Sequence, residues 1–437
     1  MERKRRLLFN TGLLTGSALI ARVVGMAFQA WLASRIGASG IGLYQLIGSV
    51  TVLFSAVAIS GIRFAAARLV SEEAGLQRGS GVTGAMLRCL CYAVIFGTAA
   101  GSVLYSLSQP IAFLWVGDAR AVQALRVASF GLPVLSLSAV FGGYFTASGR
   151  AWKAALIQVL EQAAAVICVI FLLRRCVEGD LEAICSAVVS GNVLAGLSAL
   201  LFMIAMYAAE RKRWRFAGDI PPKLTNRMLA IALPLAVSSY TRTALSTLEH
   251  LLIPRMLRRF GLGAEAALSG YGVIHGMALT AVLFPACLLF AFSEVLVPEL
   301  TNAQMQGRHN GIRHMVKKAR SSTLLYAVLS SIALLLLSNQ IAIHVFHTPE
   351  ASYAIRLLAP LVPIMNLDTV TDACLRGIGR QGLVMLINIL DALLGVTLVL
   401  ILLPRYGIHG YVMMIWVTES INCALSTIAL KHAMARC

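Results

Sequence analysis

Three arginines lie inside long apolar stretches of the sequence: Arg22 in SALIARVVGMAFQAW, Arg63 in AISGIRFAAARLV, and Arg242 in the apolar stretch that begins at residue 227. A charged side chain at the centre of a membrane-spanning helix costs about 2.5–3.5 kcal/mol on insertion scales, so it normally faces a polar cavity or a charged partner. Guanidinium groups pair readily with carboxylate or phosphate oxygens. These arginines are therefore the first candidates for a binding site.

Arg22 belongs to a polar and small-residue stripe on one face of its helix. At steps of three or four residues, this face carries Thr11, Thr15, Ala18, Arg22, Gly25 and Gln29. The opposite side is apolar and includes Ile20, Val24 and Phe28. The stripe favours a helix that faces a wet cavity, and Gln29 is its second candidate side chain. The alternative is an arginine paired with a neighbouring helix for structure alone.

Arg242 lies on a similar face, together with Ser238, Ser246 and Glu249. Arg242 and Glu249 are two turns apart, so they belong to one network or contact different partners. In the next span, His275 lies in YGVIHGM, a small-residue context that permits close helix packing. A hydrogen-bonded packing role is the alternative for this histidine.

Arg63 lies near the cytoplasmic end of the second expected span, so snorkelling to the interface competes with a cavity role.

Carboxylates gather in the C-terminal half. Asp368, Asp372 and Arg376 follow at steps of four, which predicts an exposed ion pair between Asp372 and Arg376 at a helix end. The two aspartates are also candidates for a cation or proton coupling site.

Composition places these residues in a membrane protein. The chain has 437 residues, of which 58% are hydrophobic and 13% charged, and its mean hydropathy is +0.80. The net charge of +18 comes from short basic clusters between apolar spans, which favours membrane orientation over nucleic-acid binding. The nine cysteines form no CxxC pair or Cys/His cluster, and no Walker A motif occurs. We therefore expect no enzyme, no cofactor, no metal site and no nucleic-acid partner.

Apolar spans recur from end to end and predict an all-α polytopic membrane protein of about 12 transmembrane helices. The expected spans are 7–33, 43–68, 84–107, 124–147, 151–173, 183–208, 227–253, 268–297, 319–338, 354–375, 381–403 and 408–430. The first is too long for a signal peptide, so we expect it to be an uncleaved helix. The positive-inside rule then puts both termini in the cytoplasm.

An internal repeat organises these spans. Residues 104–173 align with residues 334–403 without a gap, an offset of 230 positions that superimposes Pro133 on Pro363. The sequence therefore predicts two parallel-repeat six-helix lobes around a central cavity: residues 1–210, a basic cytoplasmic linker at 211–226, and residues 227–437. The paired prolines are candidate hinges for alternating access, with a locally tolerated kink as the alternative.

The segments SRIGASGIGLYQLIGSV, AISGIRFAAARLVSEEAG and GLPVLSLSAVFGGYFTASGRAWKAALIQVLEQ resemble the stage V sporulation protein B group of polysaccharide exporters. This group lies in the multidrug/oligosaccharidyl-lipid/polysaccharide (MOP) superfamily, together with the lipid II flippases. The resemblance implies a cationic cavity lined by arginines of the first, second and eighth helices, which Arg22 and Arg63 match by helix. The eighth helix offers His275 instead, and Arg242 is the candidate substitute. Two further C-terminal helices of many relatives, and any lipid groove they build, are expected to be missing.

The resemblance implies an alternating-access flippase in the bacterial cell membrane. Its substrate would be a lipid-linked oligosaccharide or peptidoglycan precursor, a polyprenyl diphosphate-sugar, moved from the cytoplasmic to the outer leaflet for cell wall or spore cortex synthesis. The expected partners are this substrate and membrane lipids, with cell-wall synthesis proteins as further candidates, and the expected state is a monomer. Two alternatives stay open: a drug/cation antiporter of the same superfamily, using Asp368, Asp372 and Glu249, and a non-transporting sporulation membrane scaffold.

Overall fold

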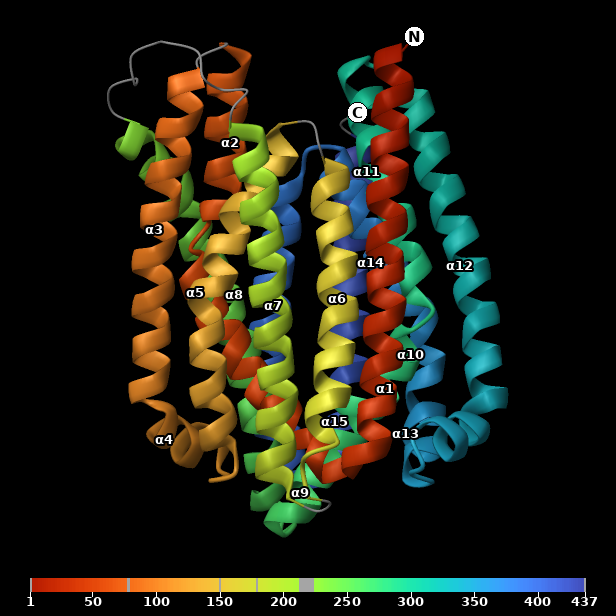
Figure 1. The fold of residues 1–437 in the computed structure, drawn as a ribbon. Helices are drawn as coiled ribbons and strands as arrows, with labels where there is room; N and C mark the ends of the chain where they lie inside the picture. Colours follow the sequence, from red (N-terminus) through yellow and green to blue (C-terminus); the bar gives the residue numbers. More distant parts are fainter. Residues whose placement is uncertain (1, 77–78, 149–150, 178–179, 212–223, 436–437) are drawn as a thin grey trace. The chain divides into compact units, whose positions relative to one another are not determined.

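The structure is a computed structural model that describes residues 2–76, 79–148, 151–177, 180–211 and 224–435 (Figure 1). Throughout this part of the chain the regular secondary structure is helical. The long helices are α1 (Glu2–Ile59), α2 (Ile62–Gly75), α3 (Gly79–Ser106), α5 (Ala121–Ala147), α6 (Ala151–Leu173), α7 (Leu181–Arg211), α8 (Leu224–Arg259), α11 (Ala286–Met305), α12 (His309–Gln340), α14 (Val362–Gly377) and α15 (Gln381–Ala435). The short helical elements are α4 (Ser108–Pro110), η1 (Ile111–Val116), α9 (Ala264–Tyr271), η3 (Gly272–Ala278), α10 (Leu279–Leu283), η4 (Ile341–Val345), α13 (Glu350–Leu358) and η5 (Ala359–Leu361).

Within the described residues, 11 helices are long and apolar enough to cross a membrane. Helices dominate because every backbone N–H and C=O inside a bilayer must find its partner within the protein. Two of the 11 cover two expected spans each. One, the stretch Leu19–Gly75, comprises most of α1, which bends at Gly37 with φ 71°, together with α2; the other, Gln381–Ala435, bends at Gly407, with φ 56°. These findings confirm the all-α, multi-pass architecture.

Two expected spans are interrupted in the structure. The span at 43–68 breaks at Ser60–Gly61, where both residues have positive φ, and α2 restarts at Ile62. The span at 268–297 divides between α10 and α11 around Pro285, because proline cannot donate the backbone hydrogen bond that would continue the helix. Hydropathy alone detects neither break, since the apolar pattern continues across both.

The chain divides into two compact units. The N-terminal unit contains Met1–Ala21 and Leu46–Thr247, and the C-terminal unit contains Arg22–Gln45 and Leu248–Cys437. The first helix and α8 therefore each contribute to both units. This grouping differs from the repeat-based division into 1–210 and 227–437, which stays a prediction, and the expected linker at 211–226 lies largely outside the described residues.

In the N-terminal unit, one hydrophobic core joins α2, α3, α5 and α7 with the first turns of α8. Small residues bring the helices close together. A Cβ on Gly143 of α5 would lie only 2.5 Å from the carbonyl oxygen of Arg63 on α2. In the C-terminal unit, the core joins α14 to α11, α12 and the end of α15. Here Gly377 of α14 packs directly on Leu300 of α11.

The repeat predicted from the sequence reappears as matching local geometry in the two units. The π-helical segment η1 begins at Ile111 and its counterpart η4 begins at Ile341, again 230 residues later. Arg126 donates through Nε to Ser108 Oγ at 3.3 Å, and the aligned pair does the same, Arg356 Nε to Ser338 Oγ at 2.9 Å. Such a specific agreement supports a duplicated helical unit.

Each of the paired prolines leaves one backbone carbonyl without its usual helical donor, and the contacts of this carbonyl differ between the two copies. Proline lacks an N–H, so the carbonyl four residues earlier loses its helical donor. In the second copy, Ser331 Oγ of α12 donates to that carbonyl, on Ala359, at 2.8 Å. In the first copy the aligned residue is Gly101, and a Cβ there would lie 2.7 Å from the freed carbonyl of Ser129. α5 continues through Pro133, whereas η5 and the start of α14 lie at Pro363.

Candidate functional site

A cavity of about 430 Å³ opens in the C-terminal unit beside the residue 22–45 part of α1. We call it the His275 cavity. It is lined by Arg22, Gly25, Met26, Gln29, Gln45, His275, Leu279, Thr280, Leu283, Cys287 and Phe290. Three candidates from the sequence therefore meet here, namely Arg22, Gln29 and His275. The members of the stripe at Thr11, Thr15 and Ala18 have side chains outside the described part of the chain.

Helical spacing places the polar stripe of α1 on this cavity, while Ile20 and Val24 are exposed on other faces of the helix. Gln29 is anchored: its Nε2 donates to Thr280 Oγ1 at 3.1 Å, and that hydroxyl donates to Gly276 O at 2.8 Å. The glutamine is therefore held by a neighbouring helical segment rather than left loose in the cavity.

Arg22 is held differently. Its guanidinium carbon lies 4.2 Å from the centroid of the Phe290 ring, a cation–π contact with α11. Within the described residues, no carboxylate pairs with this arginine. The ring supports the flat guanidinium face and leaves its N–H edge available, so the group can bind an anion bidentately.

A second cavity of about 550 Å³ shares Arg22 and Phe290 with the first, and we call it the Asp368 cavity. Its remaining lining comes from α11 and α14: Ser293, Val297, Pro298, Asp368, Thr369, Asp372, Ala373 and Arg376. The spacing of four residues puts Asp368, Asp372 and Arg376 on one face of α14, as the sequence indicated. Arg22 thus contributes to one cavity rich in neutral polar groups and to another with two carboxylates.

Both aspartates of this cavity are buried against α15. Asp368 Oδ2 accepts from Asn422 Nδ2 at 3.1 Å, and Asp372 Oδ1 accepts from Ser426 Oγ at 3.2 Å. Asp372 also pairs with Arg376 at 3.5 Å, so the predicted pair forms, but the expected exposure is wrong for its carboxylate, which packs against α15 and is buried, while the guanidinium is half-exposed. Asp368 Oδ1 has no hydrogen-bond partner among the described residues. A buried carboxylate with a free oxygen is a suitable ligand for a proton or a cation.

His275 has neighbours that the sequence did not reveal. Its ring stacks on Tyr271 with centroids 5.2 Å apart, and the His250 ring lies 4.5 Å away. Tyr411 of α15 places its hydroxyl 3.5 Å from His275 Nδ1. The packing role was the open alternative for this histidine, and His275 both packs in this aromatic cluster and reaches the cavity wall.

The remaining candidates occupy other places. Arg63, in the first turn of α2 after the Ser60–Gly61 break, is exposed and belongs to the N-terminal unit. Arg242 is exposed on α8, also in the N-terminal unit. Glu249, later on α8, falls in the C-terminal unit and packs against α15, where a Cβ on Gly395 would come within 2.7 Å of its Oε2. The linings of the two cavities do not include Glu249.

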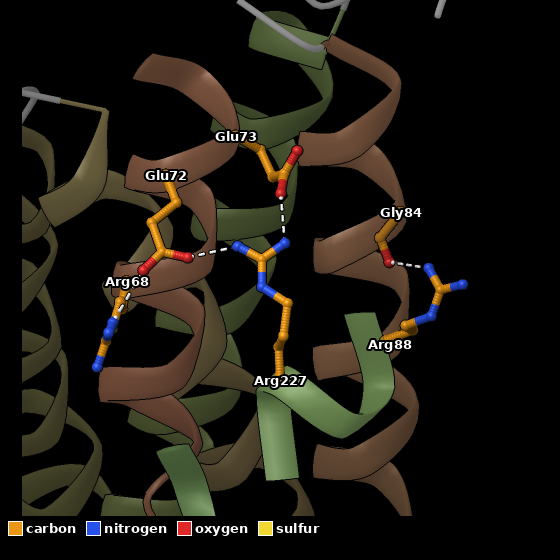
Figure 2. A network of polar contacts seen from close by, with 6 residues as sticks. All are labelled: Arg68, Glu72, Glu73, Gly84, Arg88 and Arg227. Atoms are coloured by element: carbon orange, nitrogen blue, oxygen red, sulfur yellow. Dashed lines mark hydrogen bonds and ion pairs between the residues drawn. The ribbon is translucent and has the colours of Figure 1, made fainter. Parts of the chain in front are cut away.

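A charged network fixes the start of α8 within the N-terminal unit (Figure 2). Arg227 spans two glutamates of α2, with its Nη1 2.9 Å from Glu73 Oε1 and its Nη2 2.5 Å from Glu72 Oε2. On α3, Arg88 donates to the Gly84 carbonyl at 3.1 Å and to Thr225 of α8 at 3.2 Å. The basic residues here are therefore committed to protein partners, in contrast to Arg22.

Sequence reasoning missed Thr280, Phe290, Asn422 and Ser426. One signal was present. Asn422 and Ser426 are spaced by four in an apolar helix, which matches the spacing of Asp368 and Asp372 that they contact. Phe290 had no such signal, because an aromatic residue in an apolar helix is common.

The comparisons with known proteins address the chain as a whole. Residues 7–304, more than half of its length, match the family described as polysaccharide biosynthesis protein. The chain belongs to this family. The matched range contains Arg22, Arg63, Arg242 and His275, whereas the part of the Asp368 cavity that α14 contributes lies beyond it.

This polysaccharide biosynthesis protein has relatives in Bacillus subtilis (strain 168). It is 21% identical to stage V sporulation protein B, over 93% of this chain and 80% of that protein. It is 23% identical to the lipid II flippase MurJ, over 86% of this chain and 73% of that protein. These relatives agree with the resemblance seen in the sequence motifs.

Its fold is that of solved MOP-superfamily transporters. The inward-facing conformation of a multidrug resistance MATE family transporter matches with a TM-score of 0.72 at 14% identity, covering 97% of this chain and 98% of that one. A MOP superfamily transporter from Pyrococcus furiosus matches with a TM-score of 0.69, also at 14% identity, over 98% and 95% of the two chains. These likenesses concern the fold, which is that of a multi-pass membrane transporter.

Proposed function

We propose that this protein is a flippase that moves a polyprenyl diphosphate-linked sugar from the cytoplasmic to the outer leaflet of the bacterial cell membrane. The sugar serves cell wall or spore cortex synthesis, and the protein acts by transport rather than by catalysis. Its family membership and its kinship with a protein named lipid II flippase support this proposal. Both termini lie in the cytoplasm, and the functional unit is a monomer.

The observation that carries the proposal is the set of contacts around Arg22. An arginine in a membrane span, supported by a Phe290 ring and without a carboxylate partner among the described residues, retains its full capacity to bind an anion. A lipid-linked sugar carries a diphosphate, the part of the substrate that crosses hydrocarbon least easily. Arg22 binds this diphosphate, and Arg63 and Arg242 add cationic contacts from their own helices. Gln29 and His275 offer neutral polar groups to the sugar.

The proposed mechanism of alternating access is based on the internal sequence repeat. The two six-helix lobes at 1–210 and 227–437 change their tilt, and Pro133 and Pro363 serve as paired hinges, because proline weakens the same turn in both copies.

Replacement of Arg22 tests the proposal. Proteoliposomes with the purified chain would carry a fluorescent polyprenyl diphosphate-sugar, and a membrane-impermeant sugar-cleaving enzyme would report the fraction that has reached the outer leaflet. Charge-assisted hydrogen bonds contribute about 1.5–3 kcal/mol each, so Arg22→Gln should slow translocation at least tenfold. Arg22→Lys keeps the positive charge but lacks the parallel N–H donors of the guanidinium group, so it should show an intermediate translocation rate.

Arg35→Gln is the matched control. This arginine lies on the same helix, is exposed, and contacts Trp31 rather than either cavity. It should translocate at the wild-type rate. Wild-type translocation by Arg22→Gln, at equal protein incorporation, would show that the diphosphate is not recognised by Arg22.

A cation antiporter of the same superfamily is the second candidate, and the Asp368 cavity favours it. Two buried carboxylates, one with an unpartnered oxygen, are suited to bind a proton or a cation. Asp368→Asn keeps the shape and removes the charge. If these aspartates only couple the flippase, Asp368→Asn abolishes the dependence of flipping on an ion gradient. If the protein is an antiporter, the same variant loses cation efflux, and Arg22→Gln leaves efflux intact.

A further inference from the structure

A third cavity, whose lining shares no residue with the two cavities of the candidate site, lies in the C-terminal unit between the start of α12 and the end of α15. Its volume is about 550 Å³, and we call it the basic pocket. It is lined by Arg313, Val316, Lys317, Arg320, Lys431, Met434 and Ala435. Four of its seven lining residues are cationic and none is acidic.

Among the described residues, these four cations have no acidic partner. Arg320 donates to Thr427 Oγ1 at 3.2 Å, and Arg313 reaches the carbonyl of Met434 at 3.4 Å. Both partners are uncharged. Among the described residues, no ion pair involves any of the four cations. Like charges gathered around one cavity repel each other, so an anion that enters it relieves this repulsion.

The surface next to the pocket is apolar. At helical spacing, Leu324 follows Lys317 and Arg320 on the same face of α12, and it is 45% exposed. On α15, Ile428 lies one turn before Lys431 and is 52% exposed. Cations that border an exposed apolar band on membrane-spanning helices lie at the level of the lipid headgroups. A soluble anion would use the cations alone, whereas a lipid also covers the band.

We propose that the basic pocket binds the phosphate of an anionic membrane phospholipid, with the acyl chains lying along the exposed apolar faces of α12 and α15. The guanidinium groups of Arg313 and Arg320 contact the phosphate oxygens, and the ammonium groups of Lys317 and Lys431 supply further charge at the rim. Such a site holds the ends of two helices together through a lipid. Its residues are distinct from those proposed to bind the transported sugar.

Native mass spectrometry of the purified chain tests this binding. The full chain in detergent would be titrated with phosphatidylglycerol and, separately, with zwitterionic phosphatidylcholine. Each basic residue near an anionic lipid surface strengthens binding about fivefold, so Lys317→Gln/Lys431→Gln should bind phosphatidylglycerol about thirtyfold more weakly. Binding of phosphatidylcholine should stay unchanged.

The matched control is Lys318→Gln/Arg308→Gln, which removes two exposed cations near the same end of α12 and outside the pocket lining. It should bind phosphatidylglycerol like the wild type. If the pocket double variant fails to fold, single Lys431→Gln replaces it, with about a fivefold loss expected. Equal phosphatidylglycerol affinity in pocket and control variants overturns the proposal. Displacement of phosphatidylglycerol by equimolar inorganic phosphate also overturns it, because the occupant is then a soluble anion.

Discussion

The ion pair between Arg227 and Glu73 provides a quantitative test of how the start of α8 is held. The Glu73 side chain is fully buried; its Oε1 pairs with Arg227, while its Oε2 has no hydrogen-bond partner among the described residues. Arg227→Met keeps most of the length of the side chain and removes the charge. The buried carboxylate then loses the guanidinium group that Figure 2 shows beside it.

The size of the effect follows from the exposure of each partner. Removing one partner of a fully buried pair costs about 3–5 kcal/mol, whereas exposed pairs contribute about 0.2–1 kcal/mol. Here Glu73 is 0% exposed and Arg227 is 40% exposed, so water screens one side of the pair. We expect Arg227→Met to lower the free energy of unfolding by about 2–3 kcal/mol. The contact of Arg227 with the half-exposed Glu72 adds about 0.5 kcal/mol at most.

The assay is a double-mutant cycle on unfolding of the purified chain in detergent. Glu73→Gln removes the buried charge, so in the Arg227→Met background it should restore more than half of the lost stability. Arg68→Met is the control, because Arg68 pairs with Glu72 at the surface and is 66% exposed. Arg68→Met should cost about 0.5 kcal/mol or less. If Arg227→Met costs no more than Arg68→Met, Glu73 does not depend on Arg227.

Two further substitutions test local packing. Ser331→Ala should lower stability by about 0.5–1.5 kcal/mol in an unfolding experiment, because it removes the hydroxyl that donates to the Ala359 carbonyl and leaves this carbonyl with the N–H of Val362. Gly272→Ala should prevent η3 from packing on α1, because its Cβ would overlap the carbonyl oxygen of Ala38. Limited proteolysis would detect the loosened segment as new cleavage sites.

Each of these substitutions has a matched control at a nearby residue. Ser330 donates only to the Tyr326 carbonyl within its own helix, so Ser330→Ala should have a smaller effect than Ser331→Ala. A Cβ on Gly48 meets nothing within 4 Å, so Gly48→Ala should leave the proteolytic pattern unchanged. Equal effects within either pair would contradict the packing argument.

Most of the fold could be predicted from the sequence, because membrane spans are marked by long apolar runs and the repeat is marked by aligned residues. The breaks could not be predicted in this way. Ser60–Gly61 and Pro285 interrupt helices inside continuous apolar stretches, where the composition on the two sides is alike. The membership of residues 22–45 in the C-terminal unit was also missed, because it depends on long-range packing, such as that of Gly42 on Leu268.

For the candidate site, helical periodicity puts Arg22 and Gln29 on one face of their helix and Asp368 and Asp372 on one face of theirs, and in the structure each pair lines a cavity. It could not identify Phe290, because a cation–π contact depends on the approach of two helices rather than on spacing within one. The functional roles of these residues, and of Arg63 and Arg242, stay predictions that the translocation assay addresses.

The different contacts of the carbonyl freed by each proline bear on how the two repeats evolved. Pro133 and Pro363 occupy aligned positions, so the proline was present in the ancestral unit before it was duplicated. Its neighbours diverged afterwards: one copy has Ser331 as a hydrogen-bond donor, and the other has Gly101, which lets the helices approach directly. The halves of this chain therefore have the same proline turn with different local support, so bending at both prolines would strain a side-chain hydrogen bond in one half and a direct helix contact in the other.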